Sequence, residues 1–267
     1  MDSIHKTGSG EDEQARANAA VWARGEFVDH YASRELRPAE VMFLVRYRDE
    51  LRGSVLELGC GAGRLTGYLI EMASEVYGID ISPRMIDHCK RVYPGGNFHT
   101  LDLREIASLG TERFDAVIGT YNVLGVLGEE ERRQALSTIA AVLRPGGLLM
   151  ISAHNLAFVP KLRDPTDLRG RNLLRSAGRL VLLPGRMRNR RALAAQQRTG
   201  DGYAIVNDDA HNYRLLHYYI SRDAQERQLR ELGFEFVECL DHNGHTVPAG
   251  QDAADWVELY YVARLPS

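Results

Sequence analysis

The stretch that decides the fold is Val55-Leu56-Glu57-Leu58-Gly59-Cys60-Gly61-Ala62-Gly63-Arg64-Leu65. It joins a short apolar run to an amphipathic segment through three glycines at alternate positions. We expect a strand, a tight turn and a helix, because glycine adopts the backbone conformations of such a turn and lets a ligand approach the main chain closely. The third glycine comes too early for the dinucleotide-binding fingerprint.

The same rhythm continues on the C-terminal side of this stretch. Short apolar runs alternate with amphipathic helical segments, which predicts an α/β fold with a parallel sheet covered by helices on both faces. Upstream, two helices are expected, the second opened by Pro38 and carrying Val41, Leu44, Val45 and Leu51 on one face. The apolar runs are 55–58, 76–79, 98–101, 116–118 and 148–151.

An acidic residue closes the second run. Asp80 lies 21 positions after Gly59, where a carboxylate can accept hydrogen bonds from ribose hydroxyls. The sequence therefore predicts a nucleoside ligand at the carboxyl ends of the first two strands.

At this point the residues resemble the class I S-adenosylmethionine-dependent methyltransferases. The resemblance is specific over roughly 53–153 and softer over 221–264. Its motifs are the E-x-G-x-G-x-G turn from Glu57, then Asp80, the pair Asp102-Leu103, the stretch Phe114-Asp115-Ala116-Val117, and Leu143-Arg144-Pro145-Gly146-Gly147.

The resemblance implies a Rossmann-like three-layer sandwich. Its mostly parallel seven-stranded sheet would have the order 3-2-1-4-5-7-6, with the last strand antiparallel, a helical N-terminal cap and an inserted lid. The expected divisions are a disordered tail (1–12), the cap (13–51), the cofactor-binding core (52–153), the lid or substrate segment (154–220) and a closing helix and hairpin (221–267).

The resemblance also implies roles for individual residues toward S-adenosyl-L-methionine. Glu57 and the three glycines would pass beneath the amino-acid part, Asp80 would hold the ribose, and Asp102 would take the adenine amino group. The full set of expected cofactor-binding residues is Glu57, Gly59, Gly61, Gly63, Asp80, Ile81, Met85, Asp102, Leu103, Tyr121 and Asn122, with Val123 beside the sulfonium end.

The methyl acceptor is less well marked. Thr120-Tyr121-Asn122-Val123-Leu124 lacks the paired prolines typical of methyltransferases that modify nucleobase amines or glutamine amides, which disfavours that class. A hydroxyl acceptor needs a general base, and histidine suits neutral pH. His154 is our first candidate base, followed by His217 and His211. Candidate acceptor contacts are Tyr31, Asn155, Tyr218, Tyr219 and Arg188.

Each of these histidines can instead be structural. The segment 208–219, dense in His and Tyr, can equally be a half-buried strand whose alternate rings pack on the core.

Charge distribution leaves one further question open. The chain of 267 residues has a formal net charge of −3, yet residues 161–199 hold eleven basic and two acidic side chains. This segment can contact an anionic acceptor, dock RNA, or form a solvated helix face.

Composition favours a cytoplasmic protein. The three cysteines are widely spaced and indicate no metal site and no disulfide framework, and neither a signal peptide nor a membrane span is expected.

The sequence thus predicts an enzyme that methylates a hydroxyl, amine or carbon of a small molecule, for example in natural-product or cell-surface sugar tailoring. An RNA methyltransferase and a non-catalytic cofactor-binding regulatory protein are the alternatives, and the oligomeric state stays open.

Overall fold

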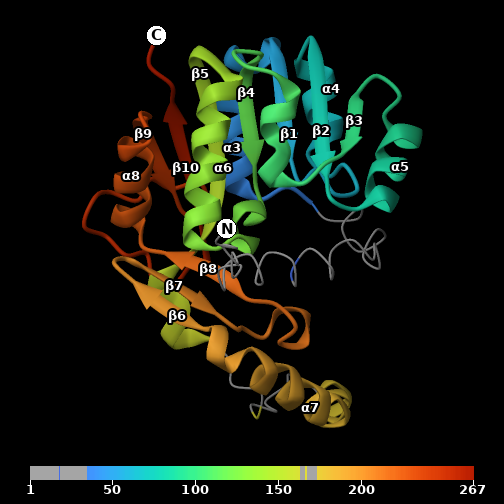
Figure 1. The fold of residues 1–267 in the computed structure, drawn as a ribbon, viewed down its shortest axis with the longest axis vertical. Coiled ribbons are helices and arrows are strands. Elements are labelled where there is room, and N and C mark those ends of the chain that lie inside the picture. Colours follow the sequence, from blue (N-terminus) through green and yellow to red (C-terminus); the bar gives the residue numbers. More distant parts are fainter. Residues whose placement is uncertain (1–17, 19–34, 163–165, 167–172) are drawn as a thin grey trace, which may run out of the picture.

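The computed structural model describes residues 18, 35–162, 166 and 173–267. A sheet with helices on both sides forms one part of the molecule. The insert within residues 154–220 extends from this part and includes the long helix α7 (Leu173–Leu193) (Figure 1). The predicted tail 1–12 and the first predicted helix, with Tyr31, lie outside the described residues.

The main sheet confirms the predicted strand order. Seven strands run β3-β2-β1-β4-β5-β10-β9; the first five are parallel, and β10 is antiparallel to both of its neighbours, β5 and β9. The strands are β1 (Ser54–Leu58), β2 (Glu75–Asp80), β3 (Asn97–Thr100), β4 (Phe114–Gly119), β5 (Leu143–Asn155), β9 (Glu235–Leu240) and β10 (Glu258–Arg264).

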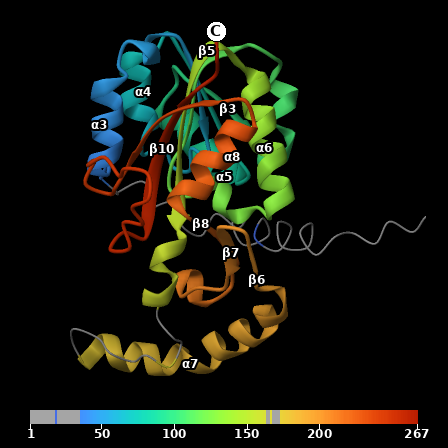
Figure 2. The ribbon, with the colours of Figure 1, turned by 90° about the vertical axis from the view of Figure 1, so that its left-hand side faces the viewer.

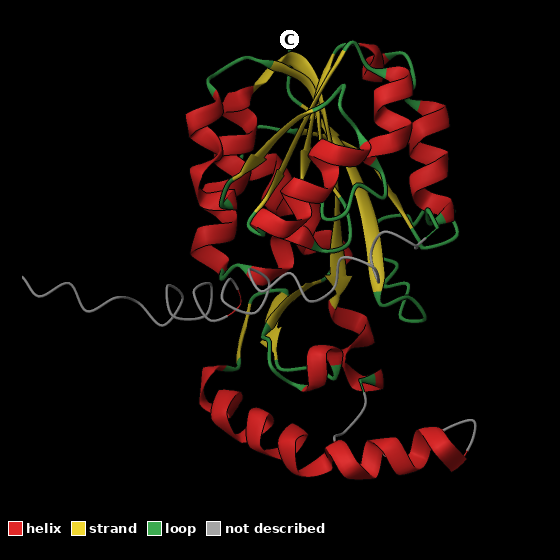
Figure 3. Ribbon diagram, turned by 90° about the vertical axis from the view of Figure 1, so that its right-hand side faces the viewer, coloured by secondary structure: helices red, strands yellow, loops and turns green. Residues whose placement is uncertain are grey.

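Helices cover both faces of this sheet (Figure 3). Successive strand residues point to opposite faces, so Val117 of β4 packs in the cluster with α6 and α8, and Ile118 packs in the cluster with α3 and α4. A third, smaller cluster of buried residues joins α5 to β3. The helices are α3 (Pro38–Arg46), α4 (Thr66–Met72), α5 (Pro83–Val92), α6 (Glu129–Val142) and α8 (Arg222–Glu231).

The predicted buried face of α3 is partly wrong. Val41 and Val45 are 45% and 67% exposed, whereas Phe43 and Leu44 are buried, as is Glu40. Glu40 lies one turn before Phe43 and Leu44, so the three share a helix face. Glu40 forms an ion pair with Arg64, which turns this face of α3 toward the sheet. The spacing of apolar residues alone did not reveal this contact.

The insert adds three strands to the seven of the predicted sheet, so the sheet has ten strands. Strand β8 (His217–Ile220) pairs in parallel with the end of β5, and β7 (Tyr203–Val206) and β6 (Arg198–Gly200) continue from it in antiparallel pairs. The alternative reading of 208–219 as a strand is confirmed for 217–220, which is buried on both faces and not half-buried.

Helix α7 lies at the end of the insert farthest from the parallel sheet (Figure 2). None of the described helices, α7 included, is long and apolar enough to cross a membrane. Short 3₁₀ turns complete the described chain at Glu50–Arg52, Leu103–Leu109, Val123–Val126, Leu156–Lys161, Ala194–Gln196 and Ala210–Asn212.

Candidate active site

The glycine turn after β1 has the conformation that its sequence predicts. Gly59, Gly61 and Gly63 have φ values of 59°, 55° and 84°, a region that L side chains rarely adopt. A Cβ on Gly59 would lie 2.3 Å from a methyl group of Val123, and one on Gly63 would lie 2.3 Å from the ring of Tyr93. Larger residues at these two positions would therefore both strain the backbone and clash.

Asp80 connects this turn to the end of β2. Its Oδ2 accepts a hydrogen bond from the Gly61 backbone N–H at 3.0 Å, and its Oδ1 accepts one from the Ser82 N–H at 2.8 Å. Burial raises the pKa of Asp80, and these two hydrogen bonds only partly oppose the shift. Each carboxylate oxygen keeps a lone pair for a further donor.

Glu57 is a buried carboxyl group beneath the same turn. Its Oε2 accepts from the Thr66 hydroxyl at 2.5 Å. Burial raises the pKa of Glu57 to about 7, although the Thr66 hydrogen bond and the charge of Arg64 act in the opposite direction. A cationic ligand group beside Glu57 would favour its ionised form.

Asp102 is engaged differently from what we expected. It caps the turn that begins at Leu103, and both of its oxygens accept hydrogen bonds from Arg104, at 2.9 Å and 2.7 Å from the guanidinium. Burial acts to raise the pKa of Asp102, but the contacts with Arg104 outweigh it and lower the pKa. An adenine amino group would therefore have to share this carboxylate with Arg104. Met85 is buried and Ile81 half-buried near the start of α5.

The residues after β4 form a strained turn. Tyr121 and Asn122 both have positive φ values, 59° and 53°. The Tyr121 hydroxyl accepts from Arg37 at 3.1 Å, and the Arg64 guanidinium lies 4.5 Å from the centre of its ring. The Asn122 N–H donates to the Ser152 hydroxyl at 2.9 Å, while the buried Asn122 Oδ1 has no partner among the described residues.

Arg37, Glu40 and Arg64 are neighbours of this site that sequence reasoning missed. Arg64 donates to both carboxylate oxygens of Glu40 at 2.6 Å, and the Glu40 side chain is 1% exposed. Arg64 directly follows the last glycine of the turn, and this position could have identified it as a neighbour of the site. Nothing in the sequence connected Arg37 or Glu40 with this site, because their contacts with Tyr121 and Arg64 span more than twenty residues.

A second group of polar side chains gathers where β5 meets β8. His217 Nδ1 lies 2.8 Å from Asp208 Oδ2, which also accepts from the Tyr219 hydroxyl at 2.7 Å. The ring of His154 stacks on that of Tyr219 at 4.7 Å and lies 5.3 Å from that of His217. Since β5 and β8 are paired with His154 opposite Tyr219, the sheet itself brings the two histidines together.

Asp208 was not among the predicted site residues. It is 4% exposed, and its Oδ1 accepts from the Ala210 N–H at 3.0 Å. Asn207 holds the following loop by donating to the carbonyls of Tyr213 at 3.0 Å and Leu215 at 2.6 Å. The loop contacts therefore fix the position of Asp208. The sequence prediction relied on helix and strand periodicity, which does not reveal such contacts.

The electrostatics of this group differ from one member to the next. Burial first, and then the charge of the neighbouring His217, lower the pKa of His154 to about 3. Burial acts to raise the pKa of Asp208, but the charge and hydrogen bond of His217 outweigh it and hold that pKa well below its usual range. His154 is thus a neutral neighbour, and Asp208 a carboxylate at neutral pH.

Two residues that we expected to contact the acceptor, Asn155 and Tyr218, are held by other contacts within the protein. Asn155 is fully buried, and its amide donates to the carbonyls of Asp252, Ala253 and Trp256 while its oxygen accepts from Ala157. Tyr218 points to the opposite face of β8 from His217 and Tyr219, because side chains alternate along a strand.

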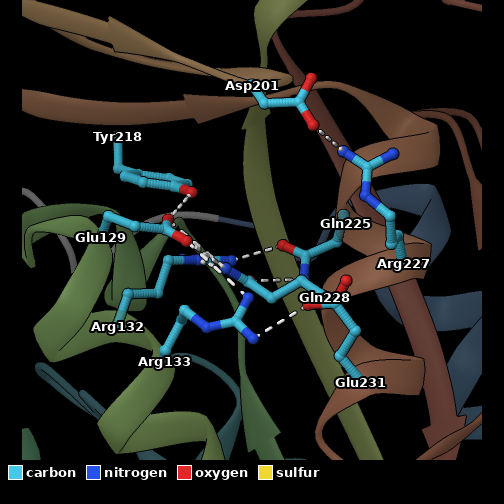
Figure 4. Close-up of polar contacts among 9 residues, drawn as sticks. All are labelled: Glu129, Arg132, Arg133, Asp201, Tyr218, Gln225, Arg227, Gln228 and Glu231. Atoms are coloured by element: carbon cyan, nitrogen blue, oxygen red, sulfur yellow. Dashed lines mark hydrogen bonds and ion pairs between the residues drawn. The ribbon is translucent and has the colours of Figure 1, made fainter.

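Tyr218 belongs to a buried network between α6 and α8 (Figure 4). Its hydroxyl donates to Glu129, and the Arg132 guanidinium lies 4.9 Å from the centre of its ring. Arg132 is fully buried and donates to Gln225 at 2.5 Å and to Gln228 at 3.4 Å. This network anchors β8 to the core.

The remaining predicted residues lie in the insert. His211 is in the turn Ala210–Asn212 with a φ of 50°. Arg188 is exposed on α7, whereas the nearby Arg186 is buried with its guanidinium 5.1 Å from the Tyr213 ring.

Comparison with known proteins agrees with this architecture. Residues 55–147 match the family described as "Methyltransferase domain". A dTDP-3-amino-3,4,6-trideoxy-alpha-D-glucopyranose N,N-dimethyltransferase of Streptomyces venezuelae is 28% identical over 114 residues, 42% of this chain and 47% of that protein. A malonyl-[acyl-carrier protein] O-methyltransferase of Salmonella typhimurium is 29% identical over 153 residues, 57% of this chain and 59% of that protein. The chain spans about half the length of these relatives.

A solved structure extends the similarity of fold to the whole chain. The 1,6-didemethyltoxoflavin-N1-methyltransferase of Burkholderia thailandensis, solved with its substrate and S-adenosylhomocysteine, matches with a TM-score of 0.60 and 17% identity. The match covers 100% of this chain and 94% of that one. At this identity the match establishes the fold alone.

Proposed function

We propose that the protein transfers a methyl group from S-adenosylmethionine to a small molecule, because residues 55–147 match the methyltransferase-domain family. The observation that carries the proposal is the hydrogen bond between the Gly61 N–H and Asp80. It joins the glycine turn after β1 to the carboxylate after β2, and it leaves one edge of the sheet lined by main chain and buried acidic groups.

The residues at this edge fit the charges of S-adenosylmethionine. Glu57 is a buried carboxyl group whose recorded hydrogen-bond donor is the neutral Thr66 hydroxyl, so it suits the ligand's ammonium group. Asp80 has lone pairs left for ribose hydroxyls. When bound, the cofactor supplies an electrophilic methyl group on a sulfonium. The protein would align the acceptor and exclude water.

The remaining assignments on this side stay proposals. Ile81 and Met85 would flank the adenine, with Asp102 and Leu103 at its far edge. The Asn122 Oδ1, buried and without a partner among the described residues, suits a polar or cationic ligand atom.

On the acceptor side we propose that residues 154–220 bind the methyl acceptor, with Arg188 facing an anionic group of it. That this insert acts as a lid, and that Tyr31 contributes to it, remain predictions. We also propose a cytoplasmic location, because the three cysteines are unpaired and buried, as is usual in a reducing compartment.

Calorimetry with S-adenosylhomocysteine and with NAD tests the cofactor. We expect micromolar binding of the first and none of the second. Tight NAD binding without S-adenosylhomocysteine binding would overturn the proposal.

Transfer is tested by incubation with methyl-labelled cofactor and fractionated cell extract. Label in the metabolite fraction supports a small-molecule acceptor. Label in RNA, with binding that weakens steeply as salt rises, would support the RNA alternative instead. Cofactor binding without label in any fraction would favour the non-catalytic alternative.

A further inference from the structure

We propose that His217, positioned by Asp208, takes the proton from a hydroxyl group of the methyl acceptor, so that the protein forms a methyl–oxygen bond. This inference rests on the proposed function and names its acceptor class. It begins from the 2.8 Å contact between His217 Nδ1 and Asp208 Oδ2, which fixes the imidazole ring in the wall formed by β5 and β8.

Geometry favours His217 over the other two histidines. A carboxylate on Nδ1 makes that nitrogen the donor and leaves Nε2 as the proton acceptor, and it stabilises the imidazolium that forms. Among the described residues Nε2 of His217 has no recorded hydrogen bond. His154 has no carboxylate partner, and its Nδ1 is buried without a partner in the described part of the chain. His211 is not one of the three side chains whose ligand atoms lie within 4.8 Å of one another in the described part of the chain.

The pair lies beside the turn that follows β4. A Cβ on Gly125 would be 3.4 Å from the Cβ of Asn122 and 3.8 Å from Cδ2 of His154. Asn122 is a proposed cofactor contact, and His154 adjoins His217. The proposed cofactor contact Asn122 and the histidine group are therefore neighbours on either side of Gly125.

A hydroxyl acceptor is the class of acceptor that needs such a base. A hydroxyl group is a poor nucleophile until its proton is removed, whereas a neutral amine attacks without a base. In the step, the acceptor O–H proton moves to His217 Nε2 as the oxygen forms a bond to the methyl carbon. The sulfur–methyl bond breaks, its electron pair stays on sulfur, and the imidazolium later returns its proton to solvent.

The surroundings of His217 maintain this role. Asp208 and Tyr219 belong to the same hydrogen-bonded unit, and the neutral His154 adds no charge at neutral pH. Arg132, on α6, acts electrostatically on His154 from the opposite side of β8. Asp208 is thus the negative group in direct contact with the imidazole.

The first experiment identifies the atom that receives the methyl group. The wild-type protein is incubated with [methyl-¹³C]S-adenosylmethionine and metabolite extract, and the carbon shift of the transferred methyl distinguishes methoxy, N-methyl and C-methyl products. We expect a methoxy signal. An N-methyl or C-methyl signal overturns the inference while leaving the proposed function intact, whereas cofactor binding with no transfer removes the proposed function itself.

The second experiment tests the residues with the acceptor so found. His217→Gln should lower kcat by roughly 10²–10⁴-fold with unchanged S-adenosylhomocysteine affinity. Asp208→Asn should lower kcat with the KM and the S-adenosylhomocysteine affinity unchanged, a split that a structural role would not produce. His245→Gln, at a side chain 78% exposed, is the matched control. Near-native kcat in His217→Gln would overturn the inference.

Two further measurements do not depend on the variants folding. In ¹⁵N spectra of the wild-type protein, His217 should carry its proton on Nδ1; a proton on Nε2 contradicts the proposal. His154, Asp208 and His217 each have one possible metal-ligand atom, and these three atoms lie within 4.8 Å of one another. Because a metal ion could bind at this spacing, an EDTA test distinguishes a metal site from a base. Unchanged activity after EDTA treatment supports the base, and activity lost to EDTA and restored by Zn²⁺ or Co²⁺ overturns it.

Discussion

The two sides of the proposed site are built in different ways. The cofactor side, from Glu57 to Asp80, lies within one short stretch of chain and depends on main-chain geometry and one backbone hydrogen bond to a carboxylate. The acceptor side joins His154 to Asp208, His217 and Tyr219, more than fifty residues away, through the pairing of β5 with β8. The first is a local motif, and the second exists only in the folded sheet.

The carboxyl groups of the two sides also differ in the direction of their pKa shifts. Burial raises the pKa of Glu57 and Asp80, which lack a directly bonded cationic side chain among the described residues. The pKa of Asp208 is lowered because His217 compensates its charge. The carboxyl groups of the cofactor side are therefore arranged for charges that a ligand brings, whereas the charge of Asp208 is compensated within the protein.

The largest expected effect is on stability, and it tests whether the acceptor side can be weakened without weakening cofactor binding. Arg132→Ala should lower the free energy of unfolding by about 2–5 kcal/mol, because it leaves a cavity and unpaired buried amides at the junction of β8 with α6 and α8. Chemical denaturation measures it. Arg133→Ala, on the same helix but 38% exposed, should cost less than about 1 kcal/mol. Weaker S-adenosylhomocysteine binding per folded Arg132→Ala molecule would contradict the separation.

The raised pKa of Glu57 predicts a pH dependence of stability. Between its ordinary pKa of 4.5 and about 7, the unfolded chain loses the proton while the folded protein keeps it. Unfolding free energy should therefore fall by roughly 3 kcal/mol as the pH rises through this window, relative to Glu57→Gln. Denaturation curves of both proteins from pH 4.5 to 7.5 measure the difference. Parallel pH profiles would show that Glu57 does not titrate there.

Removing Asp80 should affect the cofactor side alone. Asp80→Ala is expected to weaken S-adenosylhomocysteine binding by about 1–3 kcal/mol, since it removes a ribose acceptor and the hydrogen bond that holds Gly61. Calorimetry measures the change, with Asp87→Ala, exposed on α5, as control. Equal affinities in the two variants would remove Asp80 from the cofactor site.

The smallest expected effect concerns the exposed arginines of α7. Arg188→Gln combined with Arg191→Gln should raise the KM of an anionic acceptor by up to about fivefold, as exposed charge pairs contribute at most about 1 kcal/mol. Cofactor affinity should not change. Steady-state kinetics at low salt decides between an acceptor contact and a solvated helix face, which an unchanged KM would indicate.

The sequence predicted the strands and the glycine turn of the proposed cofactor side well, because their signals are local. The glycine turn, the position of Asp80 and the order of five apolar runs all follow from residues close together in the chain. The order of the main sheet was confirmed for the same reason, since parallel strands joined by short helices leave few arrangements. Val41 and Val45 were misplaced because a buried ion pair between Glu40 and Arg64, invisible to hydrophobic spacing, set the rotation of α3.

On the acceptor side the sequence by itself determined that His154 ends the fifth strand and that residues 208–219 are rich in His and Tyr. Only the tertiary structure decided which of them meet. The alternation along β8 turns His217 and Tyr219 toward His154 and sends Tyr218 into the network with Arg132. Asp208 reaches His217 through a loop fixed by Asn207. Such contacts depend on strand register and loop closure across many residues, and no local pattern encodes them.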